Sequence, residues 1–206
     1  MVELKDVLFK FEDGNDYVLK HINLQIKEGD FTLIVGNVKS GKTTLFRLLK
    51  DELELKVGHI LLNKLDTSLY SKKEIYKDFA FMPEMISFED CFTVKDNMML
   101  MNRHPQTSYE ECLDKLGIRS LLNKPIIFLN GLERRQVYLA AMLTFNPKVL
   151  VVDDISSNLD NTRAEILYQD LAKLNQEGLT ILAFTKHRAY ASFFKKSYYL
   201  ENGHLI

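Results

Sequence analysis

The chain has 206 residues, of which 46% are hydrophobic, and its 27 basic and 28 acidic residues give a formal net charge of −1. This length and composition predict one globular domain, residues 1–206, with a substantial core. The balanced charge excludes an overall field that would attract nucleic acid, so we expect no nucleic-acid partner.

The N-terminal pattern, the apolar runs and the cysteines indicate the cellular compartment to expect. The N-terminal "MVELKDVLFKFEDG" alternates polar and apolar residues, which is typical of neither a signal peptide nor an anchor. No apolar run approaches the roughly 20 residues that span a bilayer. Cys91 and Cys112 have no metal-type spacing. We therefore expect two free thiols, buried or half-buried, in a reducing cytoplasmic compartment.

The first elements in chain order are strands. Near-alternating apolar residues predict strands over 2–9 and 17–26, with a turn at "EDGN" (12–15) between them. "DFTLIVG" (30–36) is nearly all apolar and ends in glycine, as a strand buried on both faces of a parallel sheet does.

A phosphate-binding loop follows this strand. "GNVKSGKT" (36–43) matches G-x-x-x-x-G-K-[ST] and precedes a segment with helical spacing of leucines. Its glycines allow successive backbone N–H groups to point at phosphate oxygens, and the helix dipole adds to their attraction. Lys42 is predicted to reach the β- and γ-phosphates, and the Thr43 hydroxyl to ligate Mg²⁺. The predicted nucleotide contacts here are Gly36, Asn37, Lys39, Ser40, Gly41, Lys42, Thr43 and Thr44.

The middle of the chain divides into two kinds of pattern. "GHILLN" (58–63) and "DFAFM" (78–82) predict strands, and helical spacing then extends from about 84 to 146. We expect residues 1–83 and 147–206 to form a nucleotide-binding core, and the segment between them a helical subdomain.

Two carboxylates end the next predicted strand, "PKVLVVDD" (147–154). We expect this strand to lie next to the phosphate-loop strand, which places Asp153 to hold Mg²⁺ through water and Asp154 to polarise an attacking water. A helix near 160–176, a strand over 179–184 and a hairpin at Asn202-Gly203 complete the pattern. Alternating strands and helices predict an α/β fold with a parallel sheet covered on both sides.

The segment "FLNGLERRQVYLAAMLTFNPKVLVVDD" (128–154) resembles ABC-type ATPases, in which an L-S-G-G-Q/E-x-x-R motif starts a helix that leads into the Walker B strand. The resemblance extends over essentially the whole chain. Phe11 stands at the position of the adenine-stacking aromatic residue, and Glu84 at that of the Q-loop glutamine. "SSNLD" (156–160) is similar to the D-loop, and His187 occupies the position of the switch histidine.

This resemblance implies a P-loop NTPase core of ABC type, with an antiparallel N-terminal β-subdomain and an inserted helical subdomain. It implies two subunits, identical or different, that enclose ATP and Mg²⁺ between the phosphate loop of one and the signature helix of the other. The implied catalytic residues are Asp154, His187 and Glu84; the implied metal ligands are Thr43, Asp153 and Glu84; and the further nucleotide contacts are Phe11, Asn130, Gly131, Glu133 and Asp160.

Five departures from the family's pattern bear on the nucleotide site. Lys39 replaces an inner glycine and either adds charge near the phosphates or points to solvent. Asn130 replaces serine, a mild change because both cap helices well, whereas Leu132 replaces a glycine where backbone must approach the nucleotide. Glu84 replaces the glutamine and either ligates Mg²⁺ or repels the γ-phosphate. Asp154 replaces glutamate, which draws its carboxylate back by about 1.5 Å.

These departures predict good ATP binding with slow or partner-dependent hydrolysis. The alternative is a module that binds ATP to regulate a membrane partner and never hydrolyses it. A third reading, a cassette acting on ribosomes or in DNA repair, is disfavoured because such proteins usually carry two cassettes or a coiled-coil insertion.

Within the family, residues 156–187 are similar to the cell-division, lipoprotein-release and macrolide-efflux branch, whose members transmit force to a separate membrane protein. The methionines and aromatic residues between Met82 and Met101 match the groove that receives the membrane subunit, or they form the core of the helical subdomain. We therefore expect a cytoplasmic protein held at the inner face of the cell membrane by an integral membrane subunit.

Overall fold

The computed structural model describes residues 1–12, 14, 16–71, 73, 76–102 and 104–206. Two antiparallel strands, β1 (Val2–Phe9) and β2 (Leu19–Ile26), begin the chain, and with β4 (Val57–Leu62) and β5 (Leu65–Asp66) they form a sheet in the order β2-β1-β4-β5. Burial alternates along β1 and β2 except at Lys5–Asp6 and Lys20–His21, where two successive residues are not buried, which agrees with the near-alternating apolar pattern of the sequence. The predicted turn at 12–15 contains Asp13 and Asn15, which lie outside the described residues.

The second sheet is the centre of the molecule. Its six strands have the order β10-β9-β3-β8-β7-β6, parallel except for the β9/β10 pair. Their bounds are β3 (Phe31–Val35), β6 (Phe79–Met82), β7 (Val149–Asp153), β8 (Thr180–Thr185), β9 (Lys196–Glu201) and β10 (His204–Leu205). Every residue of β3, β7 and β8 is buried, as their continuous apolar sequences predict.

One prediction about this sheet is wrong. The Asp153 strand, β7, is not next to the phosphate-loop strand, β3, because β8 pairs with both and lies between them. Sequence periodicity indicates that a strand is buried on both faces but not which strands flank it. Asp153 still comes close to the phosphate loop because α1 (Lys42–Leu49), which follows the loop, packs on β7 and β8.

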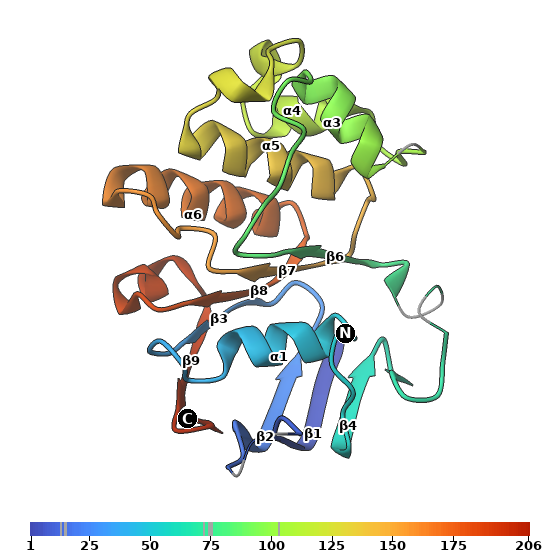
Figure 1. Cartoon of the computed structure of the whole chain (residues 1–206), viewed down its shortest axis with the longest axis vertical. Helices are drawn as coiled ribbons and strands as arrows, with labels where there is room; N and C mark the ends of the chain where they lie inside the picture. The colour runs from blue at the N-terminus through green and yellow to red at the C-terminus, as the bar shows by residue number, and fades with distance from the viewer. Residues whose placement is uncertain (13, 15, 72, 74–75, 103) are drawn as a thin grey trace.

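Helices cover both faces of the central sheet (Figure 1). The antiparallel sheet and α1 lie on one side of it, and α6 (Asn161–Gln176) and α5 (Gly131–Leu143) lie on the other. Between β6 and β7 the chain forms a helical insert. Its elements are α3 (Val94–Met101), α4 (Tyr109–Lys115), two 3₁₀ turns at Arg119–Leu121 and Ile126–Phe128, and α5; a further 3₁₀ turn, Arg188–Phe193, follows β8.

The protein has two hydrophobic cores, one on each face of the central sheet. In β7, Leu150 and Val152 belong to the core shared with α5, α6 and the helical insert, whereas Val149 and Val151 belong to the core shared with α1 and the antiparallel sheet. Successive residues of a strand point to opposite faces, so one all-apolar strand contributes to both cores. The helical insert is therefore packed onto the sheet through a common core.

Three smaller predictions have clear outcomes. The C-terminal hairpin is confirmed, since Asn202 and Gly203 both have positive φ between the paired β9 and β10. Both cysteines are free, but only Cys112 is buried; Cys91 is exposed, so the expectation of two buried or half-buried thiols is wrong for it. Among the described residues, no helix has the length and apolar character that crossing a membrane requires.

Candidate nucleotide-binding site

The phosphate loop joins β3 to α1, and its glycines are required by packing. A β-carbon on Gly36 would lie 2.6 Å from the Leu200 carbonyl oxygen and 2.5 Å from the Ser40 hydroxyl. Gly41, the N-cap of α1, has a φ of 104°, and a β-carbon there would lie 2.8 Å from a methyl group of Leu19. Larger residues at either position would displace the loop.

Lys42 lies at the centre of this loop, where its side chain is buried. The ammonium group donates to the carbonyl oxygens of Gly36 at 2.7 Å and Asn37 at 2.9 Å. Burial lowers the pKa of Lys42, and the neighbouring carboxylates Asp153 and Asp154 act to raise it. The loop thus holds a cation in a partly desolvated position, where its attraction for a phosphate is strong.

Phe11 and the phosphate loop line one hollow of about 290 Å³, together with Val18, Lys39, Ser40, Gly41, Lys42, Thr43 and Thr44. The structure thereby brings the predicted adenine-stacking residue to the predicted phosphate site. Val18 was not identified from the sequence, because an apolar residue at the start of a strand is indistinguishable there from a core residue.

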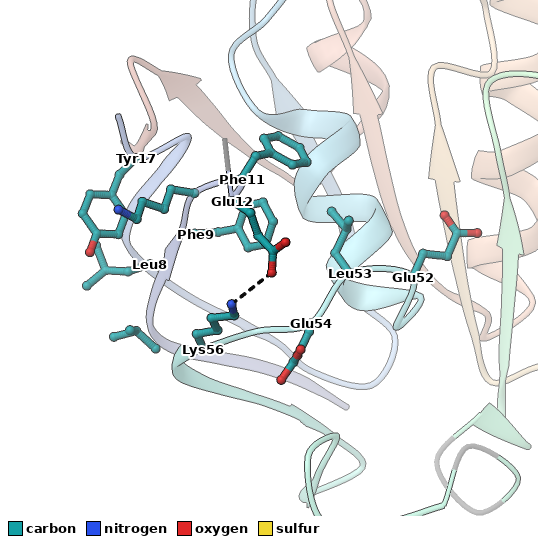
Figure 2. A pocket seen from close by; sticks show the side chains of 11 residues that line it. Leu8, Phe9, Phe11, Glu12, Tyr17, Glu52, Leu53, Glu54 and Lys56 are labelled. Atoms are coloured by element: carbon teal, nitrogen blue, oxygen red, sulfur yellow. Dashed lines mark hydrogen bonds and ion pairs between the residues drawn. The ribbon is translucent and has the colours of Figure 1, made fainter. Parts of the chain in front are cut away.

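A larger cavity of about 380 Å³ lies beside Phe11 (Figure 2). Its walls come from the end of β1 and from the segment between α1 and β4, and the Glu12–Lys56 ion pair, 3.4 Å long, lies within it. Phosphate-loop residues do not line it. The smaller hollow is therefore the candidate nucleotide site on chemical grounds, although the other is larger.

Thr43 and Asp153 form the candidate metal site. The Thr43 hydroxyl lies beside the carboxylate of Asp153, which is only 2% exposed. Burial raises the pKa of Asp153 to about 6, the Thr43 hydroxyl opposes this rise, and Glu84 and Asp154 add to it.

This donor set fits Mg²⁺. Within the described ranges, no three His, Cys, Asp or Glu side chains converge as a metal cluster. Mg²⁺ needs few protein ligands, because it keeps several waters and binds substrate phosphates. A hydroxyl and a carboxylate beside a phosphate loop supply the oxygen atoms that this ion prefers.

Asp154 is fixed by hydroxyl groups. Its Oδ1 accepts from the hydroxyls of Ser156 at 3.3 Å and Thr185 at 3.5 Å, and the Ser156 hydroxyl also lies 3.1 Å from that of Tyr168. The backbone of Asp154 is left-handed, with a φ of 35°. Only the tertiary structure identifies this hydroxyl network, because its members come from three separate segments.

Two further predicted site residues are Glu84, which precedes Asp153 and Asp154 in the sequence, and His187, which follows them. Glu84 accepts a hydrogen bond of 2.8 Å from the Ser157 hydroxyl. His187 is exposed; its backbone N–H donates to the Thr185 hydroxyl, and its ring meets Tyr190 edge-on at 5.8 Å. Glu84 is therefore already bonded, whereas the His187 ring is open to solvent.

The signature segment caps α5. Asn130 Oδ1 accepts from the Glu133 backbone N–H at 3.0 Å, and the Glu133 carboxylate accepts from the Asn130 N–H at 2.9 Å, which forms a capping box. Gly131 is exposed and faces Leu159, whose methyl group would lie 3.1 Å from a β-carbon at 131. Leu132 is half-buried and packs against the core of the helical insert.

Several predicted contacts are not brought to the phosphate loop within one chain. Asp160 caps α6 through the Arg163 N–H and pairs with the Arg163 guanidinium at 3.2 Å. In the part of the chain that the structure describes, no hydrogen bond or ion pair joins Asn130, Glu133 or Asp160 to that loop. A site that uses them needs a second subunit.

Lys39 adopts the left-handed conformation, with a φ of 66°, and is exposed. That backbone geometry favours glycine, the residue that Lys39 replaces in the pattern described above. The side chain makes no hydrogen bond or ion pair within the described ranges, and it lines the hollow that Phe11 and the phosphate loop form, so both alternatives for Lys39 stay predictions.

The methionine-rich region divides between core and surface. Met82 and Met98 are fully buried, but Met85 is 88% exposed, and Phe92, Met99 and Leu100 are also exposed. Phe92, Asp96, Met99 and Leu100 line a hollow of about 490 Å³ on the helical insert. The core alternative is therefore confirmed for Met82 and Met98, and the groove alternative stays a prediction for the exposed residues.

Comparisons with known proteins agree with this geometry. A family model described as "ABC transporter" matches residues 19–157. The energy-coupling factor transporter ATP-binding protein EcfA of Methanosphaera stadtmanae is 29% identical, over 90% of this chain and 70% of its own length. The putative ABC transporter ATP-binding protein PH0132 of Pyrococcus horikoshii is 30% identical, over 90% of this chain and 74% of its own. The cell division ATP-binding protein FtsE of Streptococcus pneumoniae is 24% identical, over 100% and 94%.

Among solved structures, the dimeric bacterial ABC transporter cassette MJ0796 superposes with a TM-score of 0.85 at 26% identity, covering 100% of this chain and 96% of that one. The same cassette in a dimeric post-hydrolysis state, bound to ADP and Pi, gives a TM-score of 0.83 with the same identity and coverage.

Proposed function

Because this chain belongs to the ABC transporter family of ATP-binding domains, we propose that two such subunits enclose ATP between them and hydrolyse it slowly to ADP and phosphate. The similarity to a dimeric cassette and to its ADP- and Pi-bound state supports this proposal. The Asn130 end of α5 and the phosphate loop would meet only across such a dimer.

The observation that carries the proposal is the arrangement of groups around the phosphate loop. The Lys42 ammonium lies within the loop and Phe11 lines the same hollow, so the ammonium and the loop amides would bind the β- and γ-phosphates and Phe11 would stack on the base. Thr43 and Asp153 would hold Mg²⁺, which neutralises charge on the bridged phosphates when it is bound. His187, open to solvent beside the site, would contact the γ-phosphate.

Slow hydrolysis follows from Asp154. As general base it would orient water for attack on the γ-phosphorus, while the bond to the ADP oxygen breaks. Its Oδ1 is already hydrogen bonded to two hydroxyls, and its side chain is one methylene shorter than glutamate. A misplacement of about 1 Å costs on the order of 100-fold in rate.

Phosphate release from the purified protein with Mg-ATP tests this proposal. Lys42→Ala supplies the blank, and Asp154→Glu should raise turnover because it returns the carboxylate toward the water. Rapid turnover of the wild-type protein would contradict slow hydrolysis. Equal phosphate release by wild type, Asp154→Glu and Lys42→Ala would exclude hydrolysis at this site.

The second candidate is a nucleotide-gated module that binds ATP without hydrolysing it. It is favoured by the Glu84–Ser157 hydrogen bond, which holds a carboxylate where the family's pattern has a glutamine. This alternative predicts measurable ATP binding with no turnover in wild type, Asp154→Glu or Glu84→Gln.

We further propose that the exposed apolar residues of the helical insert bind an integral membrane subunit, which holds this cytoplasmic protein at the inner face of the membrane. Phe92, Met99 and Leu100 give the hollow an apolar wall that suits a helix of such a partner. The "NLD" segment at 158–160 supports the force-transmitting branch of the family, whereas the energy-coupling factor relatives support a transport role.

Sedimentation with membranes from the source cells tests the docking surface. Met99→Glu and Leu100→Glu should each release the protein from the membrane fraction, because a buried unpaired charge opposes docking. Leu69→Glu, at an exposed apolar residue of the segment after β5, is the matched control and should sediment normally. Equal sedimentation of all three variants would exclude this surface.

A further inference from the structure

Arg135, in α5, is a buried cation beside the candidate site. The residue is 7% exposed, and its Nη2 donates to the Ser157 carbonyl oxygen at 3.3 Å. Its Nη1 is buried and has no hydrogen-bond partner among the described residues, where Arg135 also makes no ion pair. A charge buried in this way is costly unless other charges compensate it.

Glu84 and Asp154 carry the compensating charges. Ser157 links the first of them to Arg135, since its carbonyl accepts from the guanidinium and its hydroxyl donates to Glu84 Oε1 at 2.8 Å. Burial lowers the pKa of Arg135, and Asp154 and Glu84 act to raise it, as nearby carboxylates do. Three segments that are distant in the sequence thus meet at one cation.

This arrangement bears on what Glu84 does to a triphosphate. Glu84, Asp153 and Asp154 place three carboxylates near Lys42, and Glu84 and Asp154 raise the pKa of Asp153. A further negative group that approached the γ-phosphate would repel it. The Ser157 hydrogen bond instead directs the Glu84 carboxylate toward the loop that precedes α6.

We propose that Arg135 is a positioning residue which, with Ser157, holds Glu84 away from the γ-phosphate, so that the site accepts ATP despite its extra carboxylate. This inference rests on the proposed function only in that ATP is the ligand. Loss of either partner frees Glu84 to approach the phosphate. Replacing Glu84 with glutamine removes the negative charge, so that ATP binding no longer depends on Arg135 or Ser157.

Binding of the non-hydrolysable β,γ-imido analogue of ATP, with Mg²⁺, tests the inference by calorimetry. Ser157→Ala, which changes no charge, should weaken binding about tenfold in the Glu84 protein and less than about twofold in the Glu84→Gln protein. Arg135→Met should show the same dependence on residue 84, and Arg135→Lys should retain affinity. ADP, which lacks the γ-phosphate, should bind all variants alike.

A direct effect of the Arg135 charge on the phosphates would give a different result. Arg135→Met would then weaken binding equally with Glu84 or Gln at position 84, and Ser157→Ala would have no effect. Such additivity overturns the positioning role.

Thermal unfolding without nucleotide separates this inference from the proposed function. Arg135→Met should lower the unfolding midpoint by about 2 to 4 °C more in the Glu84 protein than in the Glu84→Gln protein. Equal shifts would overturn the inference. If the wild-type protein failed to bind the ATP analogue, the proposed function would be lost, but this cycle would still decide whether Arg135 and Glu84 interact.

Discussion

Lys39 stores strain in the phosphate loop, because its φ of 66° places a β-carbon where glycine is favoured. We expect Lys39→Gly to raise the free energy of unfolding by about 1 kcal/mol, as measured by urea denaturation. Lys39→Ala keeps the unfavourable φ and removes the charge, so it should not stabilise the protein. Stabilisation by alanine as large as that by glycine would show that charge, not backbone strain, is the cause.

We expect the ionised form of Asp153, not the protonated form, to destabilise the nucleotide-free protein. Its folded-state pKa of about 6 exceeds the ordinary value of 3.8, so the stability it gives is complete below pH 3.8 and is lost as the pH rises through 6. Asp153→Asn should therefore raise the free energy of unfolding at pH 7.5 by on the order of 2 kcal/mol, and by much less at pH 4.5.

Denaturation at the two pH values, without Mg²⁺ or nucleotide, measures this difference. A gain that is equal at both pH values would contradict ionisation as its cause. With Mg-ATP present, the wild-type protein should have the higher free energy of unfolding, because it retains the metal site and is stabilised by binding, whereas Asp153→Asn is not.

At the scale of an element, α5 depends on its capping box. Asn130→Ala removes the acceptor for the Glu133 N–H, and we expect it to cost about 1 kcal/mol in the free energy of unfolding. Asn130→Ser, which caps a helix well, should cost much less. Equal losses in urea denaturation of the two variants would mean that the amide group itself, and not the cap, stabilises α5.

At the scale of the whole molecule, the proposed dimer implies that one chain contributes two half-sites rather than one complete site. We expect Asp154→Asn, which binds ATP but cannot activate water, to form dimers with Mg-ATP and to remain monomeric without nucleotide. Lys42→Ala should stay monomeric in both conditions, because it lacks the phosphate contact. Light scattering after size-exclusion chromatography measures the mass, and dimers of Lys42→Ala would show that association does not need ATP.

Local sequence patterns are sufficient to predict most strands, the helical character of the segment 84–146 and the phosphate loop. Apolar spacing and turn residues act over a few neighbours, so β1, β3 and the Asn202-Gly203 hairpin are predictable from local physics. The loop pattern is equally local, because its glycines and Lys42 act within eight residues. Together these features and the family's motifs predict the fold class.

The packing of whole elements determines which residues distant in the sequence meet. It placed β8 between β3 and β7, Val18 beside the phosphate loop, and Arg135 beside Glu84. A sequence shows that a residue is charged or apolar, but burial and partners depend on how whole elements pack. The environment of the departures, and hence the rate expected of this site, is therefore a property of the folded chain.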